Sequence, residues 1–486
     1  MTSTNRYLLK IAEQADLQPH QERALSKLEK NKGVILNHST GSGKTKTFLT
    51  AIARDQKNNK ESRTLLVAPA PLISNIHKEI AKHKLKVDLK KVDLMSYEKA
   101  TNSSNELRKN TYTLGIADEA HKLRNVGTKR HSELGDLIAG ADHRLLATAT
   151  TSYNHISDTA PLVNIAAGGL KVLPEGKKAF EEAYVTKEVH TPGLLKRMMG
   201  HPSKEFPALK NEKDLKDRVG KYTDTYDLKD DPESAKHFPT HSTKTIEVEM
   251  SPEQHNVYKY LEGRLPWHLR LKVRSGLPLD KKESAQLNAF STGIRQASTS
   301  TRAFMPQYDH ITPKIHAAVD SLTKGLNTDK SYKGLVYSNY LQSGVDDYAR
   351  ELTKRGIPHN VYTGSTSKTD KDRMVQEYNS GKNKVLLISS SGAEGLDLKG
   401  TRTIQILDPH WNESKIKQIQ GRGIRYKSHE DLPVSERHVN IEKYHSVFPS
   451  GVFGKSRTKS IDQYLADNSE DKDSLNTRLQ TLLKSK

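Results

Sequence analysis

Short apolar runs alternate with stretches of helical periodicity through the first third of the chain. Apolar runs bounded by polar residues are typical of buried strands, and apolar residues spaced three or four apart are typical of amphipathic helices. The predicted strands are Val34–Leu36, Leu65–Ala68, Val92–Met95, Leu114–Ala117 and Leu145–Thr148, and the predicted helices are Gln21–Glu29, Thr45–Ala53, Ser74–Lys82 and Ser132–Ile138. This alternation predicts a parallel sheet covered by helices.

The pattern changes between about Gly168 and Gln307, where apolar runs become sparse and charged segments such as Lys204–Asp231 dominate. We expect a largely helical insertion here, with one strand at Thr245–Glu249. A helix is predicted over Ser251–Leu261, because Ser251 suits the N-cap and the following proline suits the first turn.

A second alternating segment begins near Ile315 and predicts a second parallel sheet. Its strands are expected at Gly334–Tyr337, His359–Tyr362, Val385–Ser389 and Thr403–Leu407, with a helix through Val345, Tyr348 and Leu352 that ends at Gly356. A C-terminal helix is expected through Leu475, Leu479 and Leu482. The predicted fold class is therefore α/β, with domains at 1–167, 168–307, 308–450 and 451–486.

Charge adds a functional expectation. The 486 residues include 78 Lys and Arg against 58 Asp and Glu, which gives a formal charge of +20. Such a surplus favours a polyanionic partner, although a basic surface that only aids solubility is the alternative.

Cysteine is absent, which excludes disulfides, thiolate metal sites and thiol catalysis. No apolar run approaches the roughly 18 residues of a membrane helix, and Met1–Lys10 lacks the apolar stretch of a signal peptide. We therefore expect no membrane partner and an intracellular location, in the cytoplasm of a host cell or in the nucleus of a eukaryotic host.

Candidate chemistry begins at the segment that runs from His38 to Thr45, between a predicted strand and a predicted helix. A glycine-bearing loop in this position cradles phosphates with its backbone N–H groups. Lys44 can reach the outer phosphates, and the Thr45 hydroxyl can bind Mg²⁺. The usual pattern opens with Gly where this chain has His38, and a chance glycine turn is the alternative. The candidate phosphate-binding residues are Thr40, Gly41, Ser42, Gly43, Lys44 and Thr45.

Two adjacent acids, Asp118 and Glu119, follow another predicted strand. Acids at this position suit a site in which Asp118 holds Mg²⁺ through water and Glu119 orients the water that attacks the γ-phosphate. A solvated acidic turn is the alternative. Thr148 and Thr150, at the end of a further strand, could link this site to the next domain by hydrogen bonds.

Two arginines far along the chain are further candidates for the chemistry of phosphate transfer. Arg422 and Arg425 lie three residues apart in the segment that begins at Gln418, and on a helix they would share one face. Guanidinium groups stabilise the charge that spreads over a γ-phosphate during its transfer. An exposed basic helix is the alternative.

In this order, these segments resemble the DEAD/DEAH-type helicases and translocases of superfamily 2, and within them the Swi/Snf-type ATPases. The resemblance covers roughly 15–165 and 310–430, and more weakly 240–262. Departures are Ala149-Thr150-Thr151 in place of Gly-Thr-Pro, Asp397 where the family often has Asn, and Glu413 in place of Pro. They speak against nucleosome remodelling and favour a bacteriophage or large-virus member. The other segments that carry the resemblance are Leu17–Gln21, Leu66–Ile73, Ser96–Glu98, Arg144–Ala147, Gly392–Leu398 and Asp408–Asn412.

The resemblance implies two RecA-like domains with ATP and Mg²⁺ bound in the cleft between them, and stepping along a nucleic acid, with DNA expected. It implies that Gln21 contacts the base, that Gly395 and Asp397 contact nucleotide, that His121 couples the acidic segment to the motor, and that Gln418 belongs to the arginine motif. The candidate nucleic-acid contacts are Ser74, Lys78, Ser96, Tyr97, Asn339, Thr363 and Ser389.

Three alternatives remain open at this point. One is an RNA-stimulated helicase of the same superfamily. Another is a nucleic-acid-binding scaffold whose ATPase has decayed, against which Lys44, Glu119 and Arg422 speak. The third is an unrelated P-loop motor, which the distant arginines and the absence of a membrane segment disfavour.

Overall fold

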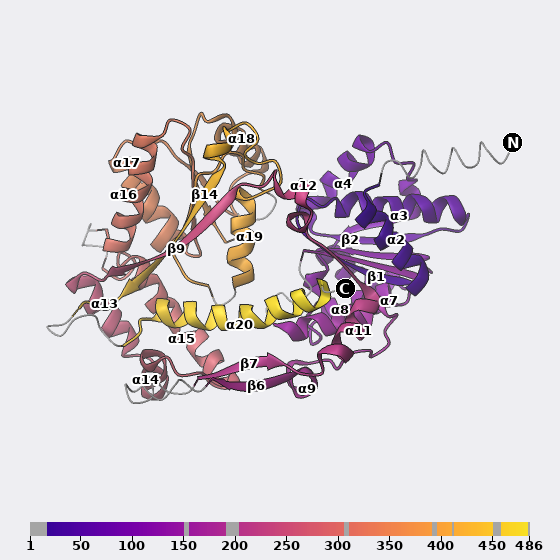
Figure 1. The fold of residues 1–486 in the computed structure, drawn as a ribbon, viewed down its shortest axis with the longest axis horizontal. Helices are drawn as coiled ribbons and strands as arrows, with labels where there is room; N and C mark the ends of the chain where they lie inside the picture. The colour runs from indigo at the N-terminus through magenta and orange to yellow at the C-terminus, as the bar shows by residue number, and fades with distance from the viewer. Residues whose placement is uncertain are drawn as a thin grey trace. The chain divides into compact units, whose positions relative to one another are not determined.

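The computed structural model describes residues 17–149, 155–190, 204–305, 311–390, 396–410, 413–450 and 458–484. The chain forms two compact units (Figure 1). The first comprises Met1–Asp231 and Ser474–Lys486, and the second comprises Pro232–Asp473.

A six-stranded parallel sheet in the order β3-β2-β4-β5-β1-β8 forms the centre of the first unit. Parallel strands buried on both faces are typically runs of apolar residues, as these mostly are. The strands are β1 (Gly33–His38), β2 (Thr64–Ala68), β3 (Val92–Ser96), β4 (Leu114–Asp118), β5 (His143–Thr148) and β8 (Thr223–Tyr226), and β6 (Val185–His190) pairs with β7 (Lys204–Leu209) in a separate antiparallel hairpin.

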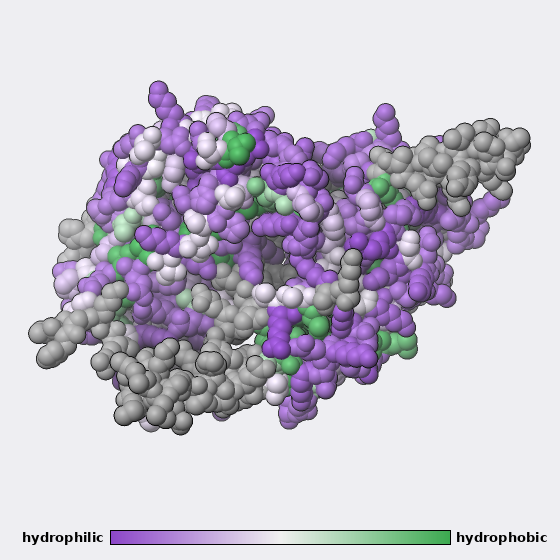
Figure 2. Space-filling view, viewed as in Figure 1, coloured by the Kyte–Doolittle hydropathy of each residue, from purple (hydrophilic) through white to green (hydrophobic). Residues whose placement is uncertain are grey.

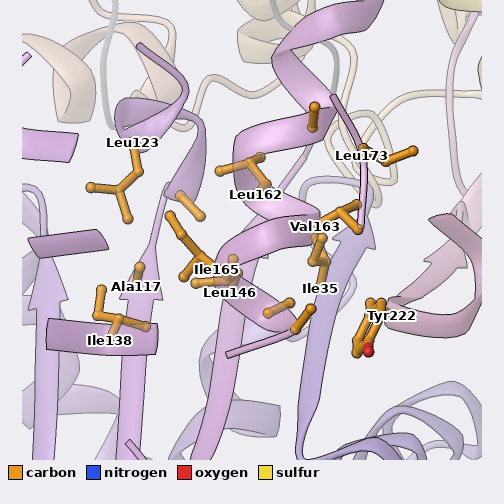
Figure 3. Packing of buried hydrophobic residues seen from close by; sticks show 14 of the residues in the cluster. Ile35, Ala117, Leu123, Ile138, Leu146, Leu162, Val163, Ile165, Leu173 and Tyr222 are labelled. Atoms are coloured by element: carbon orange, nitrogen blue, oxygen red, sulfur yellow. The ribbon is translucent and has the colours of Figure 1, made fainter. Parts of the chain in front are cut away.

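Helices cover both faces of this sheet. Successive strand residues point to opposite sides, and because the residues on both sides are apolar, each face needs a cover of helices. Leu36 and Leu145 pack into one cluster with α2 and α3, while Ile35 and Leu146 pack into the other with α8 (Figure 3). The helices of this unit are α2 (Pro19–Asn31), α3 (Lys44–Asn58), α4 (Ala70–Lys82), α5 (Tyr97–Asn102), α6 (Ser104–Leu107), α7 (Asp136–Ala139), α8 (Thr159–Ala166), α9 (Lys177–Tyr184) and α11 (Glu212–Tyr222).

The second unit contains another six-stranded parallel sheet, in the order β11-β12-β10-β13-β14-β9. Its strands are β9 (Thr240–Glu249), β10 (Gly334–Ser338), β11 (Asn360–Tyr362), β12 (Val385–Ser389), β13 (Thr403–Ile406) and β14 (His438–Val447). Its helices are α12 (Pro232–Ala235), α13 (Pro252–Glu262), α14 (Trp267–Ser275), α15 (Lys281–Thr299), α16 (Pro313–Thr328), α17 (Asp347–Lys354), α18 (Lys368–Ser380), α19 (Glu413–Gly423) and the start of α20 (Ile461–Lys484). The predicted α/β class with two parallel sheets is thus confirmed.

The chain divides at a different place from the predicted boundaries. Residues 168–307 do not form one separate body, because β8 joins the first sheet and β9 joins the second. Within α13 the expected cap is present, since the Ser251 hydroxyl accepts a hydrogen bond from the Gln254 N–H at 3.2 Å. Four strands were not predicted: β6, β7, β8 and β14.

The face of the molecule seen in Figure 2 is mainly hydrophilic, with hydrophobic residues in small separate spots. Among the helices that the structure describes, none combines the length and the apolar composition needed to cross a bilayer.

The packing of the first sheet can be tested at Leu146, which is fully buried on β5. We expect Leu146→Ala to lower the free energy of unfolding by about 2–5 kcal/mol, because a cavity replaces the lost contacts. Leu170→Ala is the control, because Leu170 is 64% exposed; its effect should stay within about 0.5 kcal/mol. Urea denaturation measures both, and equal effects would contradict the described packing.

Candidate active site

The loop after β1 turns into α3 through two glycines in left-handed backbone conformations. Gly41 has φ of 87° and Gly43 has φ of 83°, values that side chains with a Cβ adopt with strain. A Cβ at Gly43 would also lie 2.5 Å from the amide nitrogen of Gln21. Both glycines are therefore required by the shape of the loop.

The Lys44 ammonium lies against this loop, where it donates to the carbonyl oxygens of His38 at 2.7 Å and Ser39 at 3.1 Å. Thr45 follows in the first turn of α3. Gln21 of α2 also contacts this loop, and its side-chain amide donates to the Gly43 carbonyl at 3.1 Å. The backbone N–H groups of the helix N-terminus, together with Lys44, make a strong anion-binding arrangement.

Asp118 ends β4 and is buried, with 7% of its surface exposed. Burial and the nearby Glu119 charge raise the pKa of Asp118 to about 7, while the Lys44 ammonium and the Glu119 N–H lower it. The Lys44 ammonium at the loop and the Asp118 carboxyl at the strand end therefore interact electrostatically. A bound cation would favour the ionised form of this buried carboxyl.

Glu119 has a left-handed backbone, with φ of 54°, which is uncommon for a residue other than glycine. This conformation directs the chain away from β4 into a short 3₁₀ turn, Ala120–Leu123. The Glu119 side chain is 34% exposed, and His121 Nδ1 lies 3.3 Å from its carboxylate. His121 is thus placed to orient the Glu119 carboxylate. The left-handed backbone of Glu119 is a strained conformation of a kind that is common at functional sites.

The donor set fits one magnesium ion that is shared with phosphates. Within the part of the chain that the structure describes, no group of three or more His, Asp or Glu side chains could hold a metal. Mg²⁺ is typically held by one or two carboxylates together with substrate phosphates and water. Asp118 and the Thr45 hydroxyl match that need.

Tyr97 was predicted to contact nucleic acid, and this prediction is wrong. Its side chain is fully buried, and its hydroxyl donates to the Asp118 carbonyl at 2.8 Å. Tyr97 therefore holds the backbone at the acidic end of β4 by this hydrogen bond. Ser96 caps α5 by accepting from the Lys99 N–H at 3.2 Å, and it lies at the carboxyl end of β3.

Of the other predicted residues of the first unit, Thr148 lies at the same edge of the sheet. Lys78 is exposed on α4, which also carries Ser74, whose side chain is outside the described part. Thr148 is fully buried at the end of β5, opposite Asn37 of β1. Thr150 lies outside the described residues.

In the second unit, Arg422 lies in the last turn of α19, one helical turn after Gln418. The helix ends at Gly423, so Arg425 does not share a helical face with Arg422 as predicted. Arg425 instead donates to the Leu396 carbonyl at 2.9 Å and to the Asp397 carboxylate at 3.2 Å. Gly395 lies outside the described residues.

Asn339, Thr363 and Ser389 come together at the carboxyl ends of β10, β11 and β12, where the strands pair in parallel. The Asn339 N–H donates to the buried Asp408 carboxylate at 2.9 Å. Thr363 and Ser389 are only 8% and 6% exposed, so little of either side chain is open to a ligand in this conformation.

The sequence patterns did not predict the residues that β8 places beside the phosphate loop. Asp224 bonds to His38 at the start of the phosphate loop, and Tyr226 stacks on His20. The signal was present as Thr and Tyr residues over Thr223–Tyr226, which favour strands. It was obscured because charged residues surround it.

Comparison with known proteins now decides the family. A putative ATP-dependent RNA helicase of Acanthamoeba polyphaga mimivirus is 31% identical over 471 residues, which are 94% of this chain and 94% of that protein. The chain belongs to the superfamily 2 helicases, in their SNF2-related group. Three family descriptions match: "Type III restriction enzyme, res subunit" over residues 14–152, "SNF2-related domain" over residues 87–307, and "Helicase conserved C-terminal domain" over residues 314–427.

A termination factor NPH-I homolog of African swine fever virus is 26% identical over an alignment of 574 residues, with 94% of this chain and 76% of that protein covered. A Sulfolobus solfataricus SWI2/SNF2 ATPase core in complex with dsDNA aligns over 97% of both chains, at 15% identity and a TM-score of 0.36. Both of these relatives are viral, which agrees with the departures in the sequence. This SNF2-related helicase is therefore an ATP-hydrolysing enzyme with a nucleic-acid partner.

The support that Tyr97 gives to Asp118 can be measured. We expect Tyr97→Phe to lower the free energy of unfolding by about 1 kcal/mol, because a buried hydrogen bond to the Asp118 carbonyl is lost. Tyr260→Phe is the matched control, because Tyr260 is 66% exposed. Urea denaturation measures both variants, and a Tyr97→Phe protein as stable as the control would contradict this role.

Proposed function

We propose that this SNF2-related helicase is a motor that couples ATP hydrolysis to movement along DNA. The observation that carries the proposal is the convergence of Lys44, Asp118 and Glu119 at the carboxyl edge of the first sheet. Ligands of open α/β sheets bind at this edge. The formal charge of +20 supports a polyanionic track.

The site residues of the first unit have the following proposed tasks. Lys44 and the loop N–H groups bind the β- and γ-phosphates, and Gln21 contacts the base. Thr45 and Asp118 hold Mg²⁺, which when bound neutralises charge on the phosphate oxygens. Glu119 accepts a proton from the attacking water and orients it, with His121 holding the carboxylate in place.

Hydrolysis also requires the second unit in this proposal. Arg422 supplies a guanidinium to the charge that develops on the γ-phosphate, and Gln418 on the same helix assists it. Arg425 has a different task, because its bonds to Leu396 and Asp397 order the segment next to α19. Thr148 transmits the state of the first site through β5.

Contacts to the track are proposed for Lys78, Ser74, Ser96 and Asn339, mainly to backbone phosphates. Such contacts do not read sequence and weaken as salt rises. Stepping on RNA is the second candidate, and the mimivirus relative, a putative ATP-dependent RNA helicase, favours it. We also propose an intracellular location, which the absence of cysteine supports.

Two variants separate nucleotide binding from hydrolysis. Glu119→Gln should bind ATP normally but hydrolyse it at least about a hundredfold more slowly, because general base assistance is lost. Lys44→Ala should lose both, because the phosphate contact itself is removed. Equilibrium binding of a fluorescent ATP analogue and phosphate release measure the two steps.

Arg422→Lys belongs to the same experiment and should resemble Glu119→Gln, because a lysine keeps the charge but not the planar fork of donors. Normal turnover by either variant would contradict the corresponding role. Glu61→Gln, in an exposed turn, is the control for loss of one carboxylate.

The track is identified by the nucleic acid that stimulates ATP hydrolysis. We expect duplex DNA to raise the ATPase rate more than single-stranded DNA or RNA of equal length, with stimulation that weakens as salt increases. A rate raised only by RNA would support the second candidate. Indifference to every nucleic acid would contradict the motor itself.

A further inference from the structure

Strand β8 lies beside β1 and continues along the phosphate loop. The two strands pair in parallel up to His38, which lies opposite Tyr226. Beyond the end of β1, the Ser39 N–H still donates to the Tyr226 carbonyl at 2.9 Å, and the Leu228 N–H donates to the Ser39 hydroxyl at 3.1 Å. The first residues of the loop are therefore held by a segment almost 190 positions later in the chain.

A buried carboxylate on β8 holds the side chain at the start of the loop. His38 Nε2 lies 2.7 Å from Asp224 Oδ1, and the two side chains are 0% and 2% exposed. Arg23 of α2 donates to the same carboxylate at 2.7 and 2.9 Å. Burial raises the pKa of Asp224, but the hydrogen bonds from His38 and Arg23 outweigh it and hold that pKa below its usual value. Burial lowers the pKa of His38, so its ring is neutral near pH 7 and donates from Nε2.

The far end of the loop is tied to the same strand. The His20 ring stacks on Tyr226 with centroids 3.7 Å apart and planes at 5°. Its Nε2 lies 2.9 Å from the Ser42 carbonyl oxygen. Helix α2 is itself fastened to the start of β8, because the Lys27 ammonium donates to the Thr223 carbonyl at 2.7 Å.

These contacts meet at the acceptors of the phosphate-binding lysine. The Lys44 ammonium is held by the carbonyls of His38 and Ser39, and β8 fixes both residues through the ring of one and the N–H of the other. A glycine at position 38 would have no side chain for a partner to hold. The histidine found there lets the Asp224 carboxylate on β8 hold the loop by a hydrogen bond.

We infer that Asp224 is a positioning residue of the ATP site, which acts through His38 to place the loop carbonyls and thereby Lys44. The inference rests on the proposed nucleotide site. It assigns β8, with Asp224 and Tyr226, to the machinery that binds the triphosphate.

The test is the KM for ATP and the equilibrium affinity for N-methylanthraniloyl-ATP in the full chain. Asp224→Ala should raise both KM and Kd about tenfold, since a charge-assisted hydrogen bond is lost, with kcat within about twofold of wild type. Asp224→Asn should stay within about threefold, because its amide oxygen still accepts from His38. A purely structural role would lower the fraction of active protein, and thus kcat, without moving KM or Kd.

A matched control and a second variant complete the experiment. Asp93 on β3, at the opposite edge of the same sheet, also accepts from an arginine, at 3.1 Å from Arg63. Asp93→Ala should leave KM and Kd unchanged. His38→Ala breaks the same link from the loop side and should match Asp224→Ala, and the double variant should be no weaker than either single one. His38→Ala carries the test by itself where Asp224→Ala does not fold.

Unchanged nucleotide affinity in Asp224→Ala and His38→Ala, or fully additive losses in the double variant, would overturn the inference. A wild-type protein that binds the analogue but hydrolyses no ATP would defeat the proposed function alone, because the affinities still test Asp224. A wild type that binds no nucleotide would defeat both.

Discussion

Parallel strand pairing is the constraint on which the arrangement of this molecule depends. Both six-stranded sheets are parallel throughout, so the carboxyl ends of all their strands lie at one edge of each sheet. The phosphate loop after β1, the acids after β4 and Thr148 at the end of β5 are thereby gathered although the chain separates them widely. Helices cover both faces of the first sheet, and ligands of such open α/β sheets bind at the carboxyl ends of the strands.

Electrostatic cost is concentrated at that border. Asp118 is a carboxyl group buried beside a second acid, and its raised pKa expresses the cost of ionising it there. Lys44 relieves part of this cost, and Tyr97 fixes the backbone on which the carboxyl stands. A site in this condition gains from the arrival of a cation with a triphosphate, because the charges then complete one another. The left-handed backbone of Glu119 adds steric backbone strain at the same place.

Sequence patterns predicted most of the fold, because buried parallel strands are apolar runs and each of the predicted ones is present. The loop and the acids were found for the same reason, since each follows such a run. Strands β8 and β14 escaped, because they mix polar and apolar residues and are recognised only by their partners. Tyr97 was misassigned because its position in the sequence matched a contact segment, whereas burial depends on α5 packing beneath the sheet. Arg425 was placed on a helix that ends two residues earlier.

Asp224 shows why local sequence patterns do not predict a contact of this kind. Nothing local to His38 explains a bulky ring at a position that glycine usually fills, and nothing local to Asp224 explains a buried acid in a charged stretch. Each is costly alone, and each satisfies the other once β8 lies beside β1. The edge strand β8 also binds the loop that follows β1, because the Ser39 N–H donates to the Tyr226 carbonyl beyond the end of β1. The position of the phosphate-binding lysine is therefore set by tertiary pairing as much as by the glycines around it.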